Sequence, residues 1–224
     1  MLRLDNSPTH RFNLTFEVKL EILVPVELDS TVVQRNADRV NKSRNARPIV
    51  IIGMMGAGKS TVGRRVAHFL NIEFIDSDDE IELAAGMPIP DIFETHGEEE
   101  FRAGETRVIA RLLRTRRNAV ISTGGGAYMD PNTRKNISQH GICVWLKADV
   151  ELLFERVSRR NTRPLLRTPD PFGTLKSLVD QRYPTYALAD VTVVSHEATH
   201  EQIASTIIAT LAEYLDPTEK SQTK

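Results

Sequence analysis

The sequence has little of what marks secreted, membrane-bound or nucleic-acid-binding proteins. Its only cysteine, Cys143, cannot form a disulfide within the chain, which fits a reducing cytoplasm. No apolar run approaches the roughly 18 residues of a membrane span, and the amino terminus shows no signal-peptide pattern. A formal net charge of −1 argues against a nucleic-acid-binding surface as the main purpose. We therefore expect a cytoplasmic protein without a membrane or nucleic-acid partner.

The clearest motif that is present is a glycine-rich loop. Residues Gly53–Ser60 read GMMGAGKS and fit G-x-x-x-x-G-K-[ST], the phosphate-binding loop of nucleoside-triphosphate enzymes. The β-branched run Ile49–Ile52 before it predicts a buried strand, and the apolar spacing within Lys59–Leu70 predicts a helix. Strand, loop and helix together are the context that the motif requires, which disfavours a chance glycine-rich turn. The sequence therefore predicts a nucleotide-binding site.

The residue types of this loop suit phosphate chemistry. Its glycines let backbone N–H groups approach an anion closely, and the positive end of the following helix adds to the attraction. We expect Lys59 to reach the β- and γ-phosphates and the Ser60 hydroxyl to bind Mg²⁺. The ATP-binding residues predicted from the loop are Gly53, Gly56, Ala57, Gly58, Lys59, Ser60 and Thr61.

Beyond Pro48, strand patterns alternate with helical patterns, which implies a parallel sheet covered by helices on both faces. Ligands of such sheets bind beyond the carboxyl ends of the strands, so the loops that start at Gly53, Asp76 and Gly124 should lie at one edge. The predicted strands are Ile49–Ile52, Glu73–Asp76, Ala119–Thr123, Ile142–Leu146 and Val191–Val194. The predicted helices are Lys59–Leu70, Glu98–Thr115, Pro131–Gln139, Val150–Arg159, Thr174–Ala189 and Glu201–Leu215.

Residues 1–46 stand apart from this pattern as an N-terminal extension and linker. Apolar residues alternate strictly from Phe12 to Leu28, which predicts a long half-buried strand that needs a partner; a disordered upstream extension is the equal alternative. The polar and basic stretch from Asp29 to Arg47 is either a linker or a weak helix. We expect one domain at 47–216, a polar tail at 217–224, and a monomer whose N-terminal arm could mediate self-association.

The second predicted strand ends in a group of acids. Asp76 could hold a magnesium ion through water, because Mg²⁺ prefers few carboxylates and several waters. Asp78 could meet a substrate hydroxyl as a base or as an orienting acceptor. The alternative for Asp78 is a helix N-cap, since Asp accepts backbone N–H bonds at helix starts. Asp79 and Glu80 are typical of solvated acids in a first helical turn.

Three further features could contact a substrate. Arg102 and Glu105 are three residues apart on a predicted helix, where they form either a surface salt bridge or an arginine oriented to clamp a carboxylate; the spacing does not decide. The triplet Gly124–Gly126 follows a strand, which favours a loop that approaches a substrate over a plain turn. Arg182 precedes Tyr183 and Pro184, and simple exposure is its alternative.

A basic run between Glu155 and Arg167 leads into a loop that three prolines interrupt. In a nucleotide enzyme, a long loop with several arginines is a candidate lid that closes over phosphates and excludes water. We place this lid at about residues 160–173. A solvated basic loop is the alternative.

In their order and spacing these pieces resemble the shikimate kinase family, small P-loop kinases of the nucleoside-monophosphate-kinase type. The resemblance covers roughly Pro48 to Leu215. Its pieces are GMMGAGKST at 53–61, Asp76-Ser77-Asp78, Asp91-Ile92-Phe93, Gly97, Glu100-Phe101-Arg102, Glu105, Gly124–Gly126, Arg163-Pro164-Leu165-Leu166, Arg182, Pro184 and Tyr186. One departure is Pro90, where a small residue is more usual; it could shift the start of a short helix.

The resemblance implies an α/β fold of three layers, with a five-stranded parallel sheet flanked by helices and a mobile lid. It implies that the first and third strands are neighbours, and that Mg²⁺ and ATP serve to phosphorylate the 3-hydroxyl of shikimate in aromatic amino-acid biosynthesis. Asp78 matches the carboxylate that contacts the transferred hydroxyl, and Asp76 matches the water-mediated metal ligand. The groups matching shikimate contacts are Arg102, Arg182 and the backbone of Gly124, Gly125 and Gly126. Arg163 matches the lid arginine on the phosphates, and Arg156 matches an arginine against adenine.

Two alternatives remain beside this hypothesis. A related kinase for another small hydroxylated acid, such as gluconate, should lack the full set of acidic, arginine and glycine motifs. A regulatory nucleotide-binding module without turnover is expected to have lost Lys59 or Asp78, and both are present.

Overall fold

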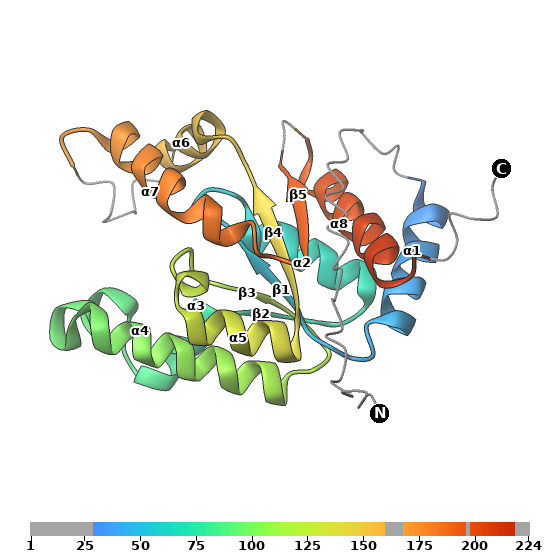
Figure 1. Cartoon of the computed structure of the whole chain (residues 1–224), viewed down its shortest axis with the longest axis horizontal. Coiled ribbons are helices and arrows are strands. Elements are labelled where there is room, and N and C mark those ends of the chain that lie inside the picture. Colours follow the sequence, from blue (N-terminus) through green and yellow to red (C-terminus); the bar gives the residue numbers. More distant parts are fainter. Residues whose placement is uncertain (1–28, 160–167, 196–197, 218–224) are drawn as a thin grey trace, which may run out of the picture.

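The computed structural model describes residues 29–159, 168–195 and 198–217. Its centre is one sheet of five parallel strands in the order β2-β3-β1-β4-β5, so the first and third strands are neighbours, as the resemblance implied (Figure 1). The strands are β1 (Ile49–Ile52), β2 (Glu73–Asp76), β3 (Ala119–Ser122), β4 (Ile142–Lys147) and β5 (Val191–Val194). The five predicted strands are confirmed, with shifts of one residue at the ends of β3 and β4.

The burial of the strands explains why the sequence marks them so clearly. Every residue of β1 and β3 is buried, because helices cover both faces of the sheet. In register, Ile51 lies opposite Ser122 on one side and Val144 on the other. The sheet thereby places the ends of β1, β2 and β3 side by side. The loops that follow these strands emerge at a common edge.

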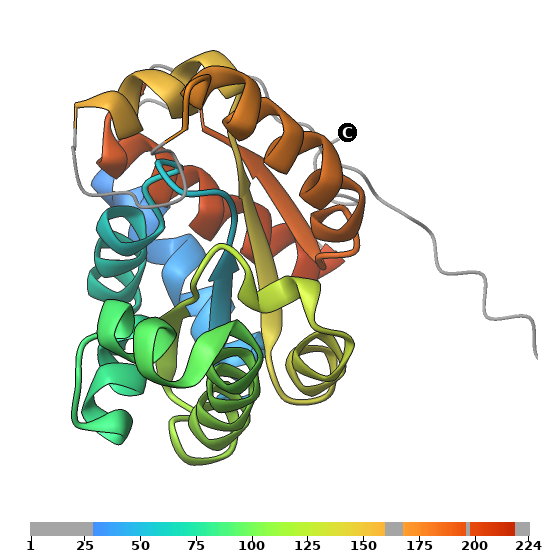
Figure 2. The same ribbon diagram turned by 90° about the vertical axis from the view of Figure 1, so that its left-hand side faces the viewer.

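The helices form the two outer layers. Helices α1, α2 and α8 pack together on one face, and α3, α4 and α5 lie on the other (Figure 1). Helices α6 and α7 contact each other beyond the edge where the phosphate loop emerges (Figure 2). The helices are α1 (Ser30–Ser43), α2 (Lys59–Leu70), α3 (Ser77–Ala85), α4 (Ile89–Thr115), α5 (Pro131–His140), α6 (Val150–Ser158), α7 (Pro171–Tyr186) and α8 (His200–Leu215), with the 3-10 turn η1 (Ala127–Met129) after β3.

Two helices begin earlier than the sequence predicted. Helix α4 begins at Ile89 instead of Glu98, and it bends at Gly97, whose φ of 78° is non-helical. Helix α7 begins at Pro171 instead of Thr174, because proline suits a first helical position and Asp170 caps the helix by accepting a 2.9 Å bond from the Gly173 N–H. The predicted helix start at Glu98 therefore coincides with the bend at Gly97, and the turns of α4 before the bend were not predicted. At α7, the proline that was read as part of a loop is the first residue of the helix.

The segment that the sequence left open between a linker and a weak helix is helix α1. Asp29 caps it, accepting a 2.8 Å bond from the Thr31 N–H. Its apolar face of Val33, Ala37 and Val40 is buried, and the helix packs against α8 and α2. The predicted strand between residues 12 and 28 lies outside the described residues, and the division of the chain at residue 46 stays a prediction.

An aromatic cluster joins α7 to the sheet. The rings of Tyr183 and Tyr186 meet Trp145 of β4 edge to face, at centroid distances of 4.9 and 5.9 Å. Tyr186 is fully buried. Such tilted pairs stabilise beyond the area that they bury, so α7 is fixed against β4. In the part of the chain that the structure describes, no helix is long and apolar enough to cross a membrane.

Candidate active site

The loop between β1 and α2 has the backbone of an anion site. Gly53, Gly56 and Gly58 have φ values of 148°, 81° and 93°, which side chains other than glycine rarely allow. A β-carbon at Gly53 would lie 2.6 Å from the Leu146 carbonyl oxygen. Gly58 caps α2 without a side-chain bond, so the first turn of the helix faces the loop with its N–H groups. Lys59 Nζ donates to the Met54 carbonyl at 3.0 Å, across the loop.

The two predicted metal ligands lie together. The Ser60 hydroxyl donates to Asp76 Oδ2 at 2.7 Å. Asp76 caps α3, because its Oδ1 accepts from the Asp78 N–H at 3.2 Å. The capping role considered for Asp78 therefore falls to Asp76, and Asp78 lies in the first turn of the helix, where the dipole favours an acid. Hydroxyl and carboxylate oxygens are ligands that suit Mg²⁺.

The glycine triplet is where the predicted substrate residues meet. A β-carbon at Gly124 would lie 2.8 Å from Glu105 Oε1 and 3.0 Å from Asp78 Oδ1. At Gly126 it would lie 2.6 Å from Arg102 Nη1. At Gly125 it would lie 3.4 Å from Arg182 Nη1 and 3.6 Å from the backbone nitrogen of Met55, within the phosphate loop. Side chains at Gly124 and Gly126 would collide with these charged groups, so glycine at both positions lets the groups converge.

Arg102 is held by two carboxylates on its own helix. Its Nη1 donates to Glu105 Oε2 at 2.8 Å, and its Nη2 lies 3.3 Å from Glu98 Oε1. Burial opposes the charge, but the hydrogen bonds and charges of Glu105 and Glu98 raise the pKa of Arg102. Burial raises the pKa of Glu105, which Arg102 partly offsets. The sequence left open whether Arg102 and Glu105 form a surface salt bridge. In the structure they form a half-buried ion pair that faces the glycine triplet.

One carboxylate oxygen of this pair stays exceptional. Glu105 is only 2% exposed. Its Oε1 has no hydrogen-bond partner within the part of the chain that the structure describes. A buried carboxylate oxygen without a donor is unfavourable. This oxygen packs against Gly124, on the same side of that residue as Asp78 Oδ1, so the carboxylate lies directly behind the glycine triplet.

Helix α7 reaches the triplet through two side chains. Arg182 Nη1 donates to the Gly125 carbonyl at 3.1 Å, and the Tyr186 hydroxyl donates to the same oxygen. The Tyr186 hydroxyl also lies 3.8 Å from Met54 Sδ, at the start of the phosphate loop. Sequence reasoning named Tyr186 only within the family resemblance and gave it no role. Its place four residues after Arg182 was the available signal, because such residues share a helix face.

The remaining predicted nucleotide residues are placed as follows. Arg156 of α6 lies beside the phosphate loop, where its Nη1 donates to Ser195 Oγ at 3.2 Å. Burial lowers the pKa of Arg156. Thr61 is exposed in the first turn of α2, and Ala57 is buried in the loop. Arg163 and most of the predicted lid fall at 160–167, outside the described residues.

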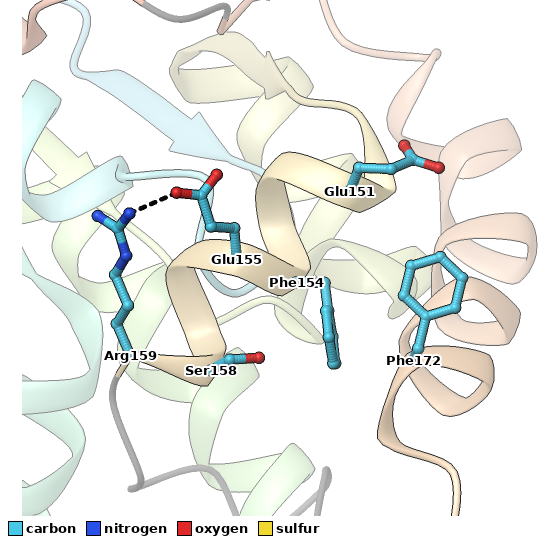
Figure 3. A pocket seen from close by; sticks show the side chains of 6 residues that line it. All are labelled: Glu151, Phe154, Glu155, Ser158, Arg159 and Phe172. Atoms are coloured by element: carbon cyan, nitrogen blue, oxygen red, sulfur yellow. Dashed lines mark hydrogen bonds and ion pairs between the residues drawn. The ribbon is translucent and has the colours of Figure 1, made fainter.

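A separate hollow of about 530 Å³ lies between α6 and α7. Phe154 and Phe172 face each other across it, with ring centroids 5.3 Å apart, and Arg159 pairs with Glu155 on its rim (Figure 3). Leu153 and Val157 of α6 face the other way, toward Gly56 of the phosphate loop. No residue predicted for the candidate site lines this hollow. Helix α6 thus separates it from the phosphate loop.

The sheet order and the loop after β1 define a P-loop protein of the α/β class, with a candidate site of arginines, acids and glycines beside the loop. The family model described as shikimate kinase matches residues 55–212. The chain is 54% identical over 169 residues to the shikimate kinase of Rhodopseudomonas palustris, covering 75% of this chain and 83% of that one. With the shikimate kinase of Novosphingobium aromaticivorans it shares 51% over 181 residues, covering 80% and 93%. The chain belongs to the shikimate kinase family.

Solved structures agree with this assignment. The structure of the shikimate kinase from Acinetobacter baumannii in complex with shikimate matches with a TM-score of 0.71 and 36% identity, covering 83% of this chain and 99% of that one. A gluconokinase from Sinorhizobium meliloti matches with a TM-score of 0.54 but only 19% identity, over 80% and 99%. The second likeness shows the fold alone. The predicted three-layer α/β fold is confirmed.

Proposed function

We propose that the protein transfers the γ-phosphoryl group of ATP to the 3-hydroxyl of shikimate, giving shikimate 3-phosphate and ADP for aromatic amino-acid biosynthesis. Membership of the shikimate kinase family supports the reaction class and the acceptor. The observation that carries the proposal is the glycine triplet, which lies beside the phosphate loop at Met55 and beside four charged side chains, those of Asp78, Arg102, Glu105 and Arg182. The glycine triplet therefore lies between the phosphate loop and the side chains proposed to bind the acceptor.

The charges around the triplet suit a small carboxylated polyol. Arg102 and Arg182 supply cations for the carboxylate, and a guanidinium offers two parallel donors to it. Asp78 accepts from the reacting hydroxyl, as a base or as an orienting group. Glu105 fixes the guanidinium of Arg102 at 2.8 Å before a substrate binds.

The phosphate loop supports the nucleotide half of the reaction. Gly53, Gly56 and Gly58 let the backbone cradle the phosphates, and Lys59 neutralises charge that develops on the transferred group. Ser60 and Asp76 would hold a magnesium ion, which supplies charge neutralisation at the phosphates when bound. No group of three or more His, Cys, Asp or Glu that could hold a metal occurs among the described residues. This small donor set fits Mg²⁺, which usually keeps several waters.

Arg156 and Arg163 complete the nucleotide site in this proposal. Arg156 lies on the outer side of the phosphate loop, beside Gly56 and Ser195, where adenine would pack against it. Arg163 lies outside the described residues, and the family resemblance is what assigns it to the phosphates. Phosphoryl transfer needs little covalent chemistry from the protein, so positioning and charge neutralisation lower the barrier.

The test is ADP release by the purified full-length protein with ATP, Mg²⁺ and one acceptor at a time: shikimate, gluconate or a nucleoside monophosphate. We expect turnover with shikimate to exceed that with the other acceptors by orders of magnitude, because only shikimate presents a carboxylate and hydroxyls in the matching arrangement. A preference for gluconate would show that the proposed acceptor is wrong, although the protein would still be a kinase. ADP release that does not depend on any acceptor would point to a module without transfer.

We also propose that the protein works as a monomer in the cytoplasm. All the residues that meet at the triplet come from one chain, which supports a site that needs no second copy. Sizing of the full-length protein by light scattering tests this; a dimer that dissociates on removal of residues 1–28 would assign self-association to the N-terminal arm.

A further inference from the structure

A second cavity lies at the opposite end of the sheet, where β1, β3 and β4 begin. It has a volume of about 360 Å³, at the lower end of the range for small-ligand sites. Its walls come from the turn before β1, the carboxyl end of α4 and the carboxyl end of α5. The lining residues are Asn45, Arg47, Leu113, Arg114, Arg117, Gln139 and His140. We call this cavity the amino-edge pocket.

The lining of the amino-edge pocket is one-sided in charge. It carries three arginines, a histidine and two amides, and it contains no carboxylate. Neither Arg114 nor Arg117 makes a hydrogen bond or ion pair to another described residue, within 29–159, 168–195 and 198–217. Two other arginines of α4 behave differently, because Arg107 and Arg111 pair with Glu100 and Glu80 at 3.0 and 2.8 Å. Arg114, near the end of α4, and Arg117, just beyond it, thus have no carboxylate partner among the described residues.

A buried guanidinium builds the frame of the pocket. Arg44 is 3% exposed, and it donates to the Arg47 carbonyl at 3.2 Å and to Oδ1 of Asn118. Arg47 returns two bonds to the Arg44 carbonyl, from its backbone N–H at 2.9 Å and from its Nε at 3.3 Å. These bonds fix Arg47 on one wall and the turn that carries Arg117 on another. The network therefore holds Arg47 and the turn before β3, whereas the side chains of Arg114 and Arg117 are exposed and make no such bond to another described residue.

Close packing fixes the third wall. The Ile142 N–H donates to the Pro48 carbonyl at 2.9 Å, and a β-carbon at Gly141 would lie 3.2 Å from that same oxygen. This places His140 beside the turn before β1. That turn holds Asn45 and Ala46 at φ values of 50° and 55°, in the left-handed region that costs energy for residues other than glycine. Backbone strain of this kind is maintained by surrounding structure and clusters at ligand sites.

Basic residues at helix ends have an ordinary explanation, since cations stabilise the negative end of a helix dipole. At this pocket, however, the positive charge of the arginines is larger than the negative charge of the helix dipoles. The carboxyl ends of α1, α4 and α5 contribute roughly half a negative charge each. Against them stand the three lining arginines and the buried Arg44. An excess of about two and a half positive charges remains at the pocket, with His140 taken as neutral.

We propose that the amino-edge pocket binds a small, multiply charged phosphate anion, at a site distinct from the phosphate loop. Guanidinium groups recognise phosphate oxygens in bidentate geometry, and the amides of Asn45 and Gln139 add neutral donors. Leu113, at 1% exposure, closes the floor. The volume of the pocket accommodates a free anion of the pyrophosphate class.

Calorimetric titration of inorganic pyrophosphate into the full-length protein tests the proposal. Saturating ADP without magnesium occupies the phosphate loop, so binding there does not contribute. We expect one further equivalent of pyrophosphate to bind, and its affinity to fall at least about tenfold in the Arg114→Gln/Arg117→Gln variant, because two charge-assisted contacts are lost. The matched control is Arg107→Gln/Arg111→Gln, which removes the same charge from α4 outside the pocket; its affinity should stay within about twofold.

Absence of the further equivalent would overturn the proposal, and so would equal loss of affinity in both double variants, which would show a general charge effect. Chemical shifts provide a readout without substitutions. In the ADP-saturated protein, pyrophosphate should shift the backbone amide resonances of Asn45, Arg117 and His140. Shifts confined to the phosphate loop would contradict the pocket.

Discussion

The two ends of the parallel sheet hold their buried arginines in different ways. At the carboxyl end, Arg102 is paired with Glu105 and Glu98, and these carboxylates raise its pKa against the effect of burial. At the amino end, Arg44 donates only to amide and carbonyl oxygens, and burial lowers its pKa. At the carboxyl end, carboxylates compensate the charge of Arg102 before a ligand binds. At the amino end, the positive charge of Arg44 has no carboxylate partner and adds to the positive potential of the arginines around it.

This difference has a functional meaning. A carboxylate partner keeps a guanidinium oriented while it waits for substrate, which is the preorganisation that catalysis requires. Neutral acceptors also orient a guanidinium, through weaker bonds, but they leave its charge uncompensated, which suits a structural frame beside an anion site. Variants that disturb one end and spare the other can therefore separate chemistry from stability.

The largest effect is expected at the carboxyl end from Asp78→Asn. An amide cannot accept a proton and orients a hydroxyl poorly, so kcat for shikimate should fall about 10²- to 10⁴-fold. ATP binding, measured by fluorescence titration, should change little. Asp79→Asn is the matched control, since Asp79 is exposed in the same helical turn. A wild-type kcat in the Asp78 variant would remove this residue from the mechanism.

Arg102→Lys should act on acceptor binding. A lysine keeps the charge but not the bidentate donors, and hydrogen bonds to charged groups contribute about 1.5–3 kcal/mol. We expect the KM for shikimate to rise by about 10- to 150-fold, with the KM for ATP nearly unchanged, in steady-state kinetics.

The control for this variant is Arg107→Lys, on the same helix and paired with Glu100 at the surface. Equal increases of both KM values in Arg102→Lys would show that the arginine supports the structure of the site instead of contacting the acceptor.

At the amino end, Arg44→Lys should lower stability without changing kinetics. Lysine cannot reach the three acceptors that Arg44 joins, so we expect the free energy of unfolding in urea to fall by about 1–3 kcal/mol. The kinetic constants for shikimate and ATP should stay unchanged, because the whole sheet separates Arg44 from the phosphate loop. Arg35→Lys, on the exposed face of α1, is the control. A change in KM would show coupling between the two ends.

The smallest effect is expected from Tyr186→Phe. The variant removes one donor to the Gly125 carbonyl while Arg182 keeps the other. A neutral hydrogen bond contributes about 0.5–1.5 kcal/mol, which predicts a rise of about 2- to 12-fold in the KM for shikimate. Tyr183→Phe is the matched control, since its hydroxyl donates to the Ala148 carbonyl instead. The same rise in both variants would indicate loosening of α7 alone.

The sequence predicted the sheet and the phosphate loop because both are local patterns. Continuous β-branched runs such as Ile49–Ile52 mark strands that are buried on both faces, and the loop motif spans eight adjacent residues. Helix α1 was left open because its apolar positions are few among polar and basic neighbours. Its buried residues Val33, Ala37 and Val40 follow helical spacing, so the signal was present but weak.

The candidate site was predictable as a set of residues but not as an arrangement. The spacing of Arg102 and Glu105 gave the ion pair, yet its burial depends on Gly124 and Gly126, about twenty residues later in the chain. Asp76 rather than Asp78 caps α3 because the helix starts at Ser77. Four acids within five residues do not show from the sequence alone at which residue the helix starts. Contacts between distant segments decided these points.

The aromatic cluster behind the triplet gives the molecule an internal optical probe. Trp145 is the only tryptophan of the chain, and it packs against Tyr183 and Tyr186 of α7. Its emission therefore reports on the one helix that also carries Arg182. Any shift of α7 that accompanies acceptor binding changes the surroundings of a single indole, so unlabelled wild-type protein can be followed in stopped flow.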